Sequence, residues 1–298
     1  MHLFNRSPKG VNVREPLTYR LSYSLIFWKG LGMKAWHVPT LVRRALSRND
    51  ESESYWKCVR ELHIRGSEEV YLAASGLCAK NNQSKILGAN ILGQLGSPAR
   101  PFSDSSLEIL WAMLATEKSP PVLNAILVAI GHLQDNSDTR KLKTITGLAD
   151  HRNETVRRGV VFALLARKDR LSISALIRLS RDKSSGVRDW ATFGLSSMVD
   201  VDTPALRDAL IERLDDSDED TRCEAMVGLA IRKDSRVLGK LKKELESRTP
   251  TALAFVAVSE LGDRSLLPLV KRHKDSISDD TNSGWILEVN EAYARLSN

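Results

Sequence analysis

The most constraining feature of this sequence is a nine-residue pattern that recurs along most of the chain. Residues 156–164, which read VRRGVVFAL, align without gaps with residues 187–195 (VRDWATFGL) and 221–229 (TRCEAMVGL). Extending the register gives seven copies, which start at Ser54, Ser84, Val122, Val156, Val187, Thr221 and Pro250. A spacing of 29 to 38 residues is typical of a unit that stacks on copies of itself, so the pattern predicts a repeat protein.

The pattern within each copy predicts an amphipathic helix. If each start is position 1, position 9 is apolar in every copy and position 5 is small or β-branched throughout. Position 8 is small or apolar except in the first copy, where Glu61 stands. Positions 1, 5, 8, 9 and 12 fall on one face of a helix with 3.6 residues per turn. Small residues at positions 5 and 8 should let a neighbouring helix approach closely, and only stacking can bury the apolar face.

A second apolar period follows each of these first helices after a short break. The clearest case begins with Thr203, which we expect to cap the helix, and Pro204, at the first helical position. The other second helices are predicted over residues 68–79, 105–115, 142–148, 173–179, 237–245 and 266–270. The predicted fold is all-α: a right-handed α-solenoid of about seven antiparallel helical hairpins.

Three segments are predicted along the chain. Residues 1–38 form a basic N-terminal extension or cap, residues 39–272 form the solenoid, and residues 273–298 form a C-terminal capping helix. In the last segment Trp285 opens an apolar run and should seal the end of the stack.

The net charge of +7 is confined to the amino-terminal part of the chain. Residues 1–50 contain nine basic and two acidic residues, and residues 51–298 contain 35 of each. We therefore do not expect the repeat body to bind nucleic acid. We interpret the basic segment as a solvated tail, with contact to an acidic partner or a membrane surface as the alternative. No run of about 20 apolar residues occurs, which predicts no membrane insertion. Three scattered cysteines are interpreted as buried hydrophobes of a cytoplasmic protein.

At these residues the chain resembles the HEAT-like repeat family, and within it the bacterial type with phycobilin-lyase repeats, over residues 40–272. The resemblance rests on the Val-Arg pair that opens several first helices, on the aspartate between repeats, and on helix endings such as residues 92–96 (LGQLG). It implies a ladder of charge-assisted hydrogen bonds between neighbouring repeats. The ladder would consist of Asp150, Arg157, Asp182, Arg188, Asp216 and Arg222.

The ladder should be confined to the middle of the array, because Lys85, Leu123 and Thr251 replace the arginine in other copies. A row of arginines at this spacing could instead bind phosphates. An aspartate shortly before each arginine favours pairing between the two side chains over contact with a ligand.

The sequence contains no recognised catalytic or metal-binding motif, so we lean towards a protein that is not an enzyme and uses no cofactor or metal. No histidine lies beside a glutamate, as it does in the di-iron hydroxylase built on this repeat. Residues 215–220 begin like a calcium loop, but threonine follows where glycine is needed. We interpret them as a solvated turn that caps the next helix. Trp190 is the candidate for contact with a partner, although such a residue is more often the rim of a core.

The sequence favours a non-catalytic protein-protein interaction scaffold that uses the concave surface of the solenoid, lined by the second helices. An immunity- or assembly-type binder is compatible with this function. The alternative is a nucleic-acid binder or a DNA base-repair glycosylase of HEAT-like fold, which would need a basic groove with aromatic residues. A bilin lyase-type subunit is a lesser alternative, implied only by the family resemblance. The partner we predict is another protein, whose identity the sequence does not give.

Overall fold

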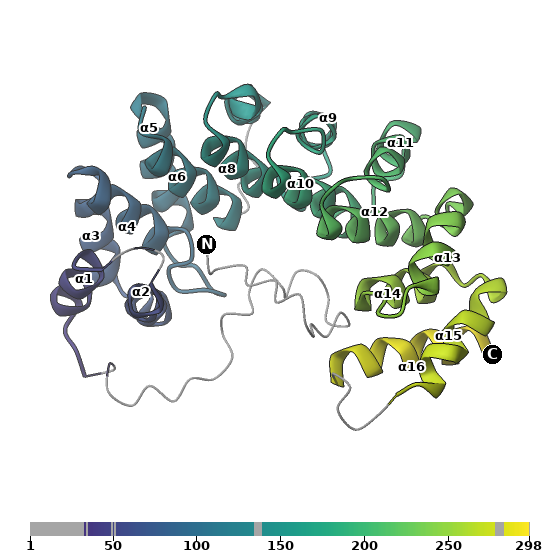
Figure 1. The fold of residues 1–298 in the computed structure, drawn as a ribbon. Helices are drawn as coiled ribbons and strands as arrows, with labels where there is room; N and C mark the ends of the chain where they lie inside the picture. Colours follow the sequence, from purple (N-terminus) through teal and green to yellow (C-terminus); the bar gives the residue numbers. More distant parts are fainter. Residues whose placement is uncertain are drawn as a thin grey trace. The chain divides into compact units, whose positions relative to one another are not determined.

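The computed structural model describes residues 33, 35–48, 50, 52–133, 139–277 and 283–297. Over these ranges the chain contains sixteen α-helices, three 3-10 turns and no β-strand, which confirms the all-α class. The predicted N-terminal extension, residues 1–38, lies almost entirely outside the described ranges, and its role stays a prediction. The chain divides after Leu165 into two compact units, each a stack of helical hairpins (Figure 1).

The first unit, unit 1, ends at Leu165 and contains eight of the described α-helices and one 3-10 turn. In chain order these are α1 (Val38–Leu46), α2 (Glu53–Arg65), α3 (Glu68–Leu77), α4 (Asn82–Leu92), α5 (Ser103–Thr116), α6 (Pro120–Leu133), α7 (Thr139–Gly147), η4 (Leu148–Asp150) and α8 (Glu154–Leu164).

The second unit, unit 2, begins at Ala166 and contains the other eight described α-helices and two 3-10 turns. In chain order these are α9 (Arg170–Leu179), α10 (Ser185–Ser197), α11 (Pro204–Arg213), α12 (Glu219–Ile231), η5 (Ser235–Val237), α13 (Leu238–Glu246), α14 (Ala252–Leu261), η6 (Arg264–Leu266), α15 (Leu267–Asp275) and α16 (Ser283–Ser297).

In each unit the helices form two rows. The even-numbered helices pack against one another in the even row, and the odd-numbered helices form the odd row (Figure 1). From α4 onward, neighbouring even helices of a unit contact each other far more extensively than neighbouring odd helices do, and the even row lies on the inside of the curve of each unit (Figure 1). The even helices α2 to α14 are the seven predicted first helices. The expectation that the second helices line the concave surface is therefore wrong.

Small residues explain why the first helices pack most closely. Gly228 stands at position 8 of α12, where an added Cβ atom would lie 2.6 Å from the Cβ atom of Ser196 on α10. An added Cβ atom on Gly131 of α6 would lie 2.4 Å from the backbone oxygen of Phe162 on α8. Real Cβ contacts are not this short, so each glycine permits an approach that alanine would prevent.

The helix ends follow the local sequence signals. Thr203 caps α11, its Oγ1 accepting a hydrogen bond from the backbone N of Leu206 at 3.3 Å, which confirms the predicted start of this helix at Pro204. Asp218 caps α12 through the backbone N of Thr221 at 2.9 Å, as expected for a capping turn. No helix in the described part of the chain is long and apolar enough to cross a membrane.

The last helix is fixed by its tryptophan. The indole Nε1 of Trp285 on α16 donates to the backbone oxygen of Pro250 at 2.8 Å. The ring also meets the ring of Phe255 on α14 edge-on, with centroids 5.2 Å apart. These contacts join the last helix to the hairpin before it.

Candidate interaction surface

Three arginines at position 2 of their helices make the same backbone contacts. In Arg157, Arg188 and Arg222, Nη1 donates to the backbone oxygens that lie six and five residues earlier, at 2.7 to 3.3 Å. These oxygens belong to the turn that precedes each helix. Each arginine therefore fastens the start of its own helix to the inter-repeat turn.

Arg188 also joins two neighbouring repeats. Its Nε and Nη2 each donate to one carboxylate oxygen of Asp216 at 2.8 Å, and Arg213 adds a third hydrogen bond at 3.2 Å. The side chains of Arg188 and Asp216 are only 13% and 4% exposed. Burial by itself would raise the pKa of Asp216, but hydrogen bonds from Arg188 and from the backbone N of Asp218 hold that pKa below its usual range. This geometry is that of one step in the implied ladder.

The carboxylates of the inter-repeat turns also organise the turns themselves. Asp182 accepts a hydrogen bond from the backbone N of Ser184 at 2.8 Å, and Asp216 accepts one from the backbone N of Asp218 at 3.0 Å. Each carboxylate thereby stabilises the turn two residues ahead of it.

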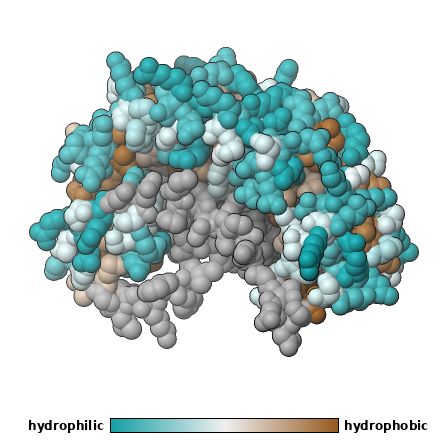
Figure 2. Space-filling model, viewed as in Figure 1, coloured by the Kyte–Doolittle hydropathy of each residue, from teal (hydrophilic) through white to brown (hydrophobic). Residues whose placement is uncertain are grey.

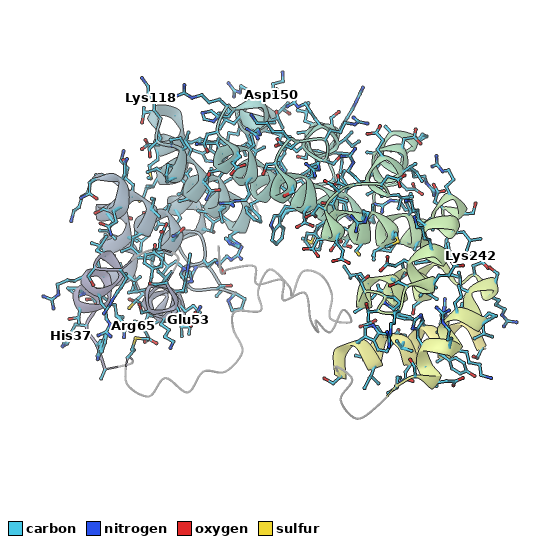
Figure 3. The ribbon with its side chains drawn as sticks, in the orientation of Figure 1. His37, Glu53, Arg65, Lys118, Asp150 and Lys242 are labelled. Carbon is cyan, nitrogen blue, oxygen red and sulfur yellow. The ribbon has the colours of Figure 1, made fainter. Side chains whose placement is uncertain are left out.

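In the preceding repeat the side chain that stabilises the turn in this way is that of His151, one residue after the predicted Asp150. The ring Nδ1 of His151 accepts a hydrogen bond from the backbone N of Asn153 at 3.1 Å. Asp150 lies one residue earlier, exposed at the end of η4 and at the outer edge of unit 1 (Figure 3). His151 therefore holds this turn as Asp182 and Asp216 hold theirs, and the part of Asp150 in the ladder stays a prediction.

Trp190, the predicted partner contact, is half-buried on α10. Its ring meets that of Phe193 edge-on, with centroids 5.7 Å apart. The tryptophan is thus partly packed within its own helix, and its role in binding stays a prediction.

Arg232 is a buried arginine whose role was not apparent in the sequence. It follows α12 and is 8% exposed, and burial lowers the pKa of its guanidinium. Its side chain donates six hydrogen bonds of 2.9 to 3.1 Å to the backbone oxygens of Leu195, Ser196, Val199, Val201 and Gly228. The guanidinium therefore ties the end of α12 to the end of α10. The sequence pattern around Arg232 does not predict its burial, because a solvent-exposed arginine could stand in the same pattern.

A polar network crosses the even row of unit 1. His63 on α2 is buried and donates from Nε2 to the backbone oxygen of Asn90 on α4 at 2.8 Å, and the Asn90 amide donates to the hydroxyl of Tyr55 at 2.9 Å. Burial lowers the pKa of His63 to about 4, and nearby Arg60 and Arg100 act in the same direction. His63 is therefore neutral at physiological pH.

A pocket of about 330 Å³ lies between α3, α4 and α5 in unit 1. Its two charged residues pair with each other, because Nζ of Lys85 lies 2.7 Å from a carboxylate oxygen of Glu117. Burial raises the pKa of the Cys78 thiol in its wall to about 11, so this thiol is not activated as a nucleophile. Among the residues that the structure describes, no three His, Cys, Asp or Glu side chains are placed to hold a metal ion.

The outward positions of the even row of unit 1 form a partly exposed face. Positions 3, 7 and 11 of its helices lie opposite the apolar positions, and apart from the buried Trp56 they hold half-buried or exposed residues. We call these residues the unit-1 face: Arg60, Ile64, Ile86, Asn90, Gln94, Asn124, Val128, His132, Arg158 and Phe162. The four even helices contain six basic and three acidic residues, a net charge of +3. The face therefore mixes basic, amide and apolar side chains.

The odd row contributes a different surface. The side of the molecule visible in Figure 2, to which both rows contribute, is mostly hydrophilic, with separate apolar patches. One exposed apolar residue of the odd row is Leu72 on α3, which is 59% exposed. Ile64 at the edge of the even row is 62% exposed, so among the described residues of unit 1 each row offers one large apolar side chain to solvent.

The repeated hairpins, their two rows and the arginine contacts at the helix starts define an α-solenoid of two-helix repeats. A family model for HEAT repeats matches residues 142–230. Protein YibA of Escherichia coli K12 is 32% identical over 215 residues, which are 71% of this chain and 76% of YibA. The chain belongs to the HEAT-repeat family, as the resemblance implied.

Solved structures agree with this assignment. The X-ray structure of Escherichia coli YibA matches with a TM-score of 0.69 and 28% identity, over 91% of this chain and 98% of YibA. Kap95p, solved with RanGDP, matches with a TM-score of 0.55 and 15% identity, over 95% of this chain and 43% of Kap95p. The second likeness is one of fold alone.

Proposed function

We propose that this protein is a non-catalytic scaffold that binds another protein on the unit-1 face. The observation that supports the proposal is the state of that face: its outward positions are half-buried or exposed, and they mix guanidinium, amide and apolar groups. Interfaces between proteins combine these chemistries, with arginine and apolar anchors inside a polar rim. An immunity- or assembly-type binder would use such a surface.

The fold supports the same proposal. Repeat solenoids present extended surfaces, and Kap95p is a protein of this fold that binds RanGDP. In the pocket of unit 1 Lys85 pairs with Glu117 and burial raises the pKa of the Cys78 thiol, which supports a non-catalytic protein.

Charge argues against the alternative of a nucleic-acid groove along the repeats. The four even helices of unit 2 contain seven acidic and three basic residues, a net charge of −4. A phosphate backbone would be repelled by that row, and duplex binding needs several basic contacts. A protein partner does not require one sign of charge along the whole chain.

The experiment that tests the proposal is a capture from a lysate of the source organism with the full chain, with and without nuclease. We expect one protein to be recovered in near-equal amount under both conditions. In parallel, duplex DNA is titrated with the full chain at increasing salt. Recovery that disappears with nuclease would contradict the proposal. So would tight duplex binding whose log affinity falls by about 0.9 per neutralised phosphate against log salt.

A further inference from the structure

The polar side chains of the unit-1 face all carry hydrogen-bond donors. Six of its ten residues are polar, and each of the six has at least one N–H group: Arg60, Asn90, Gln94, Asn124, His132 and Arg158. None of the ten is an aspartate or a glutamate. The face therefore presents N–H groups and no negative charge of its own.

A further donor reaches this face from the loop between α4 and α5. The guanidinium Nη1 of Arg100 donates to the backbone oxygen of His132, near the end of α6. The Nε atom of Arg100 is buried, and it has no hydrogen-bond partner in the part of the chain that the structure describes. Burial lowers the pKa of this guanidinium, and no carboxylate acts against burial. Arg100 is thus a cation without a counter-ion among the described residues.

The histidines beside Arg100 show the same imbalance of charge. The Nε2 atoms of Gln94 and His132 lie 3.3 Å apart. Burial lowers the pKa of His132 to about 3, and His63 and Arg100 act in the same direction. Burial, and then the charges of Arg60 and Arg100, likewise lower the pKa of His63. No carboxylate raises the pKa of either ring, so the described residues leave the positive charge at this edge of the face unbalanced.

Two more guanidinium groups lie on the face itself. Arg158, at position 3 of α8, forms no ion pair with a described residue. Arg60, at position 7 of α2, pairs with Glu53 of its own helix at 2.5 Å, and the side chain of Glu53 is 61% exposed. Exposed pairs of this kind contribute little to stability, so the carboxylate of a ligand can take the place of Glu53.

We propose that the partner bound on the unit-1 face presents an extended acidic segment, whose carboxylates pair with Arg60, Arg100 and Arg158. The inference rests on the proposed function, in which this face binds a protein, and adds the chemistry of the bound segment. A guanidinium binds a carboxylate through two parallel hydrogen bonds, and the amide and imidazole N–H groups of the face supply further donors. Between the carboxylates, apolar side chains of the segment pack against Ile64 and Phe162.

The span of the face determines the length of this segment. Helices α2, α4, α6 and α8 follow one another in the even row (Figure 1), so three interhelical spacings of about 8–10 Å separate the first helix from the last. An extended chain rises about 3.3 Å per residue, so about nine residues cross the face.

A nucleic acid would also supply acceptors, through its phosphates. It would leave the four apolar residues of the face without apolar partners, and duplex binding needs several basic contacts beyond these three arginines. An acidic segment of a protein satisfies both parts of the face, and a nucleic acid is kept as an outcome of the test.

The test measures the binding of three fluorescently labelled probes to the full chain by anisotropy. The acidic probe is a capped peptide of three Glu-Glu-Leu repeats, which matches the span of the face. The neutral probe replaces every glutamate with glutamine. The third probe is an oligothymidylate with the same net charge as the acidic peptide.

Two triple variants are compared with the wild type. The site variant carries Arg60→Gln, Arg100→Gln and Arg158→Gln. The matched control has the same change in net charge at exposed lysines of unit 1 that lie outside the face: Lys80→Gln, Lys118→Gln and Lys143→Gln.

We expect the wild type and the control to bind the acidic peptide about tenfold more tightly than the neutral peptide, and the site variant to lose this preference. Absent or equal binding of the two peptides, or an unchanged affinity in the site variant, overturns the proposal. Tighter binding of the oligothymidylate than of the acidic peptide overturns it as well. If circular dichroism shows that the site variant is unfolded, Arg60→Gln with Arg158→Gln decides: weaker binding of the acidic peptide supports the proposal, and unchanged binding overturns it.

The captured partner separates this inference from the proposed function. If Ile64→Asp weakens binding of the partner and the site variant does not, the proposed function stands and the inference fails. If neither variant weakens binding, the unit-1 face is not the binding surface and both fail. A loss of about tenfold in both variants supports both.

Discussion

Arg188 on α10 holds the carboxylate of Asp216, 28 residues further along the chain, through two parallel hydrogen bonds of 2.8 Å. The same guanidinium donates to the backbone oxygens of Asp182 and Lys183 in the turn before its own helix. One side chain therefore connects two successive inter-repeat turns. In a solenoid, where each repeat contacts only its neighbours, such a connection fixes the spacing of the stack.

The first prediction concerns this pair. Arg188→Ala should lower the free energy of unfolding by about 1–3 kcal/mol, because it leaves a buried carboxylate with fewer donors. Arg188→Lys should recover only part of the loss, since an ammonium group cannot form both parallel bonds. Urea unfolding followed by circular dichroism measures the difference. Arg264→Ala, at an exposed arginine of η6, is the control and should be near neutral. If both alanine substitutions changed the free energy of unfolding equally, Arg188 would not stabilise the stack of repeats.

The second prediction concerns pH. His63 has a pKa of about 4 in the folded protein, below the value of about 6.5 expected in the unfolded chain. Between these two values the unfolded state binds the proton and the folded state does not. Stability contributed by neutral His63 is therefore complete above pH 6.5 and is lost as the pH falls towards 4, by up to about 1.4 kcal/mol per pH unit. Urea unfolding of the wild type and of His63→Gln across this range isolates the contribution. Parallel pH profiles for the two proteins would show that His63 does not titrate in this way.

The third prediction concerns the close approach of α6 and α8. Gly131→Ala should destabilise the protein by about 1–3 kcal/mol, because its Cβ atom would meet the backbone of Phe162 and force the helices apart. Gly76→Ala on α3 is the matched control: an added Cβ atom there has no neighbour within 4 Å, and alanine favours the helix by about 0.5–1 kcal/mol. Thermal unfolding of both variants should thus give shifts of opposite sign. A stabilising Gly131→Ala would mean that the two helices are not held at this distance.

Much of the fold follows from the sequence because it depends on periodicity. The recurrence of apolar position 9 from Leu62 to Val258 gives the seven first helices, and small residues at positions 5 and 8 indicate where helices approach. Periodicity shows which face of a helix is buried. It does not show which of the two rows packs more tightly. The sequence therefore does not reveal that the first helices, and not the second helices, line the concave side of each unit.

The hydrogen-bond partners of the polar side chains are harder to predict from the sequence, because they depend on residues that are brought together only in the folded protein. The pattern around Arg188 and Asp216 repeats in the sequence, and the family resemblance pointed to the pair. Arg232 gave no such signal, because a buried arginine that saturates backbone oxygens has the same sequence context as a solvated one. The role of His151 in its turn is not visible in the sequence, because there a ring nitrogen accepts the hydrogen bond that a carboxylate accepts in the other turns.

The central claim is that the even row of unit 1 binds the partner protein, and two apolar residues of similar exposure test it. Ile64 lies on the unit-1 face and is 62% exposed, and Leu72 lies on the odd row and is 59% exposed. The decisive measurement is the affinity of the captured partner for Ile64→Asp, for Leu72→Asp and for the wild type, by isothermal titration calorimetry. The account predicts that Ile64→Asp weakens binding by about tenfold or more while Leu72→Asp leaves it unchanged. Unchanged affinity in Ile64→Asp, or an equal loss in both variants, would contradict the claim.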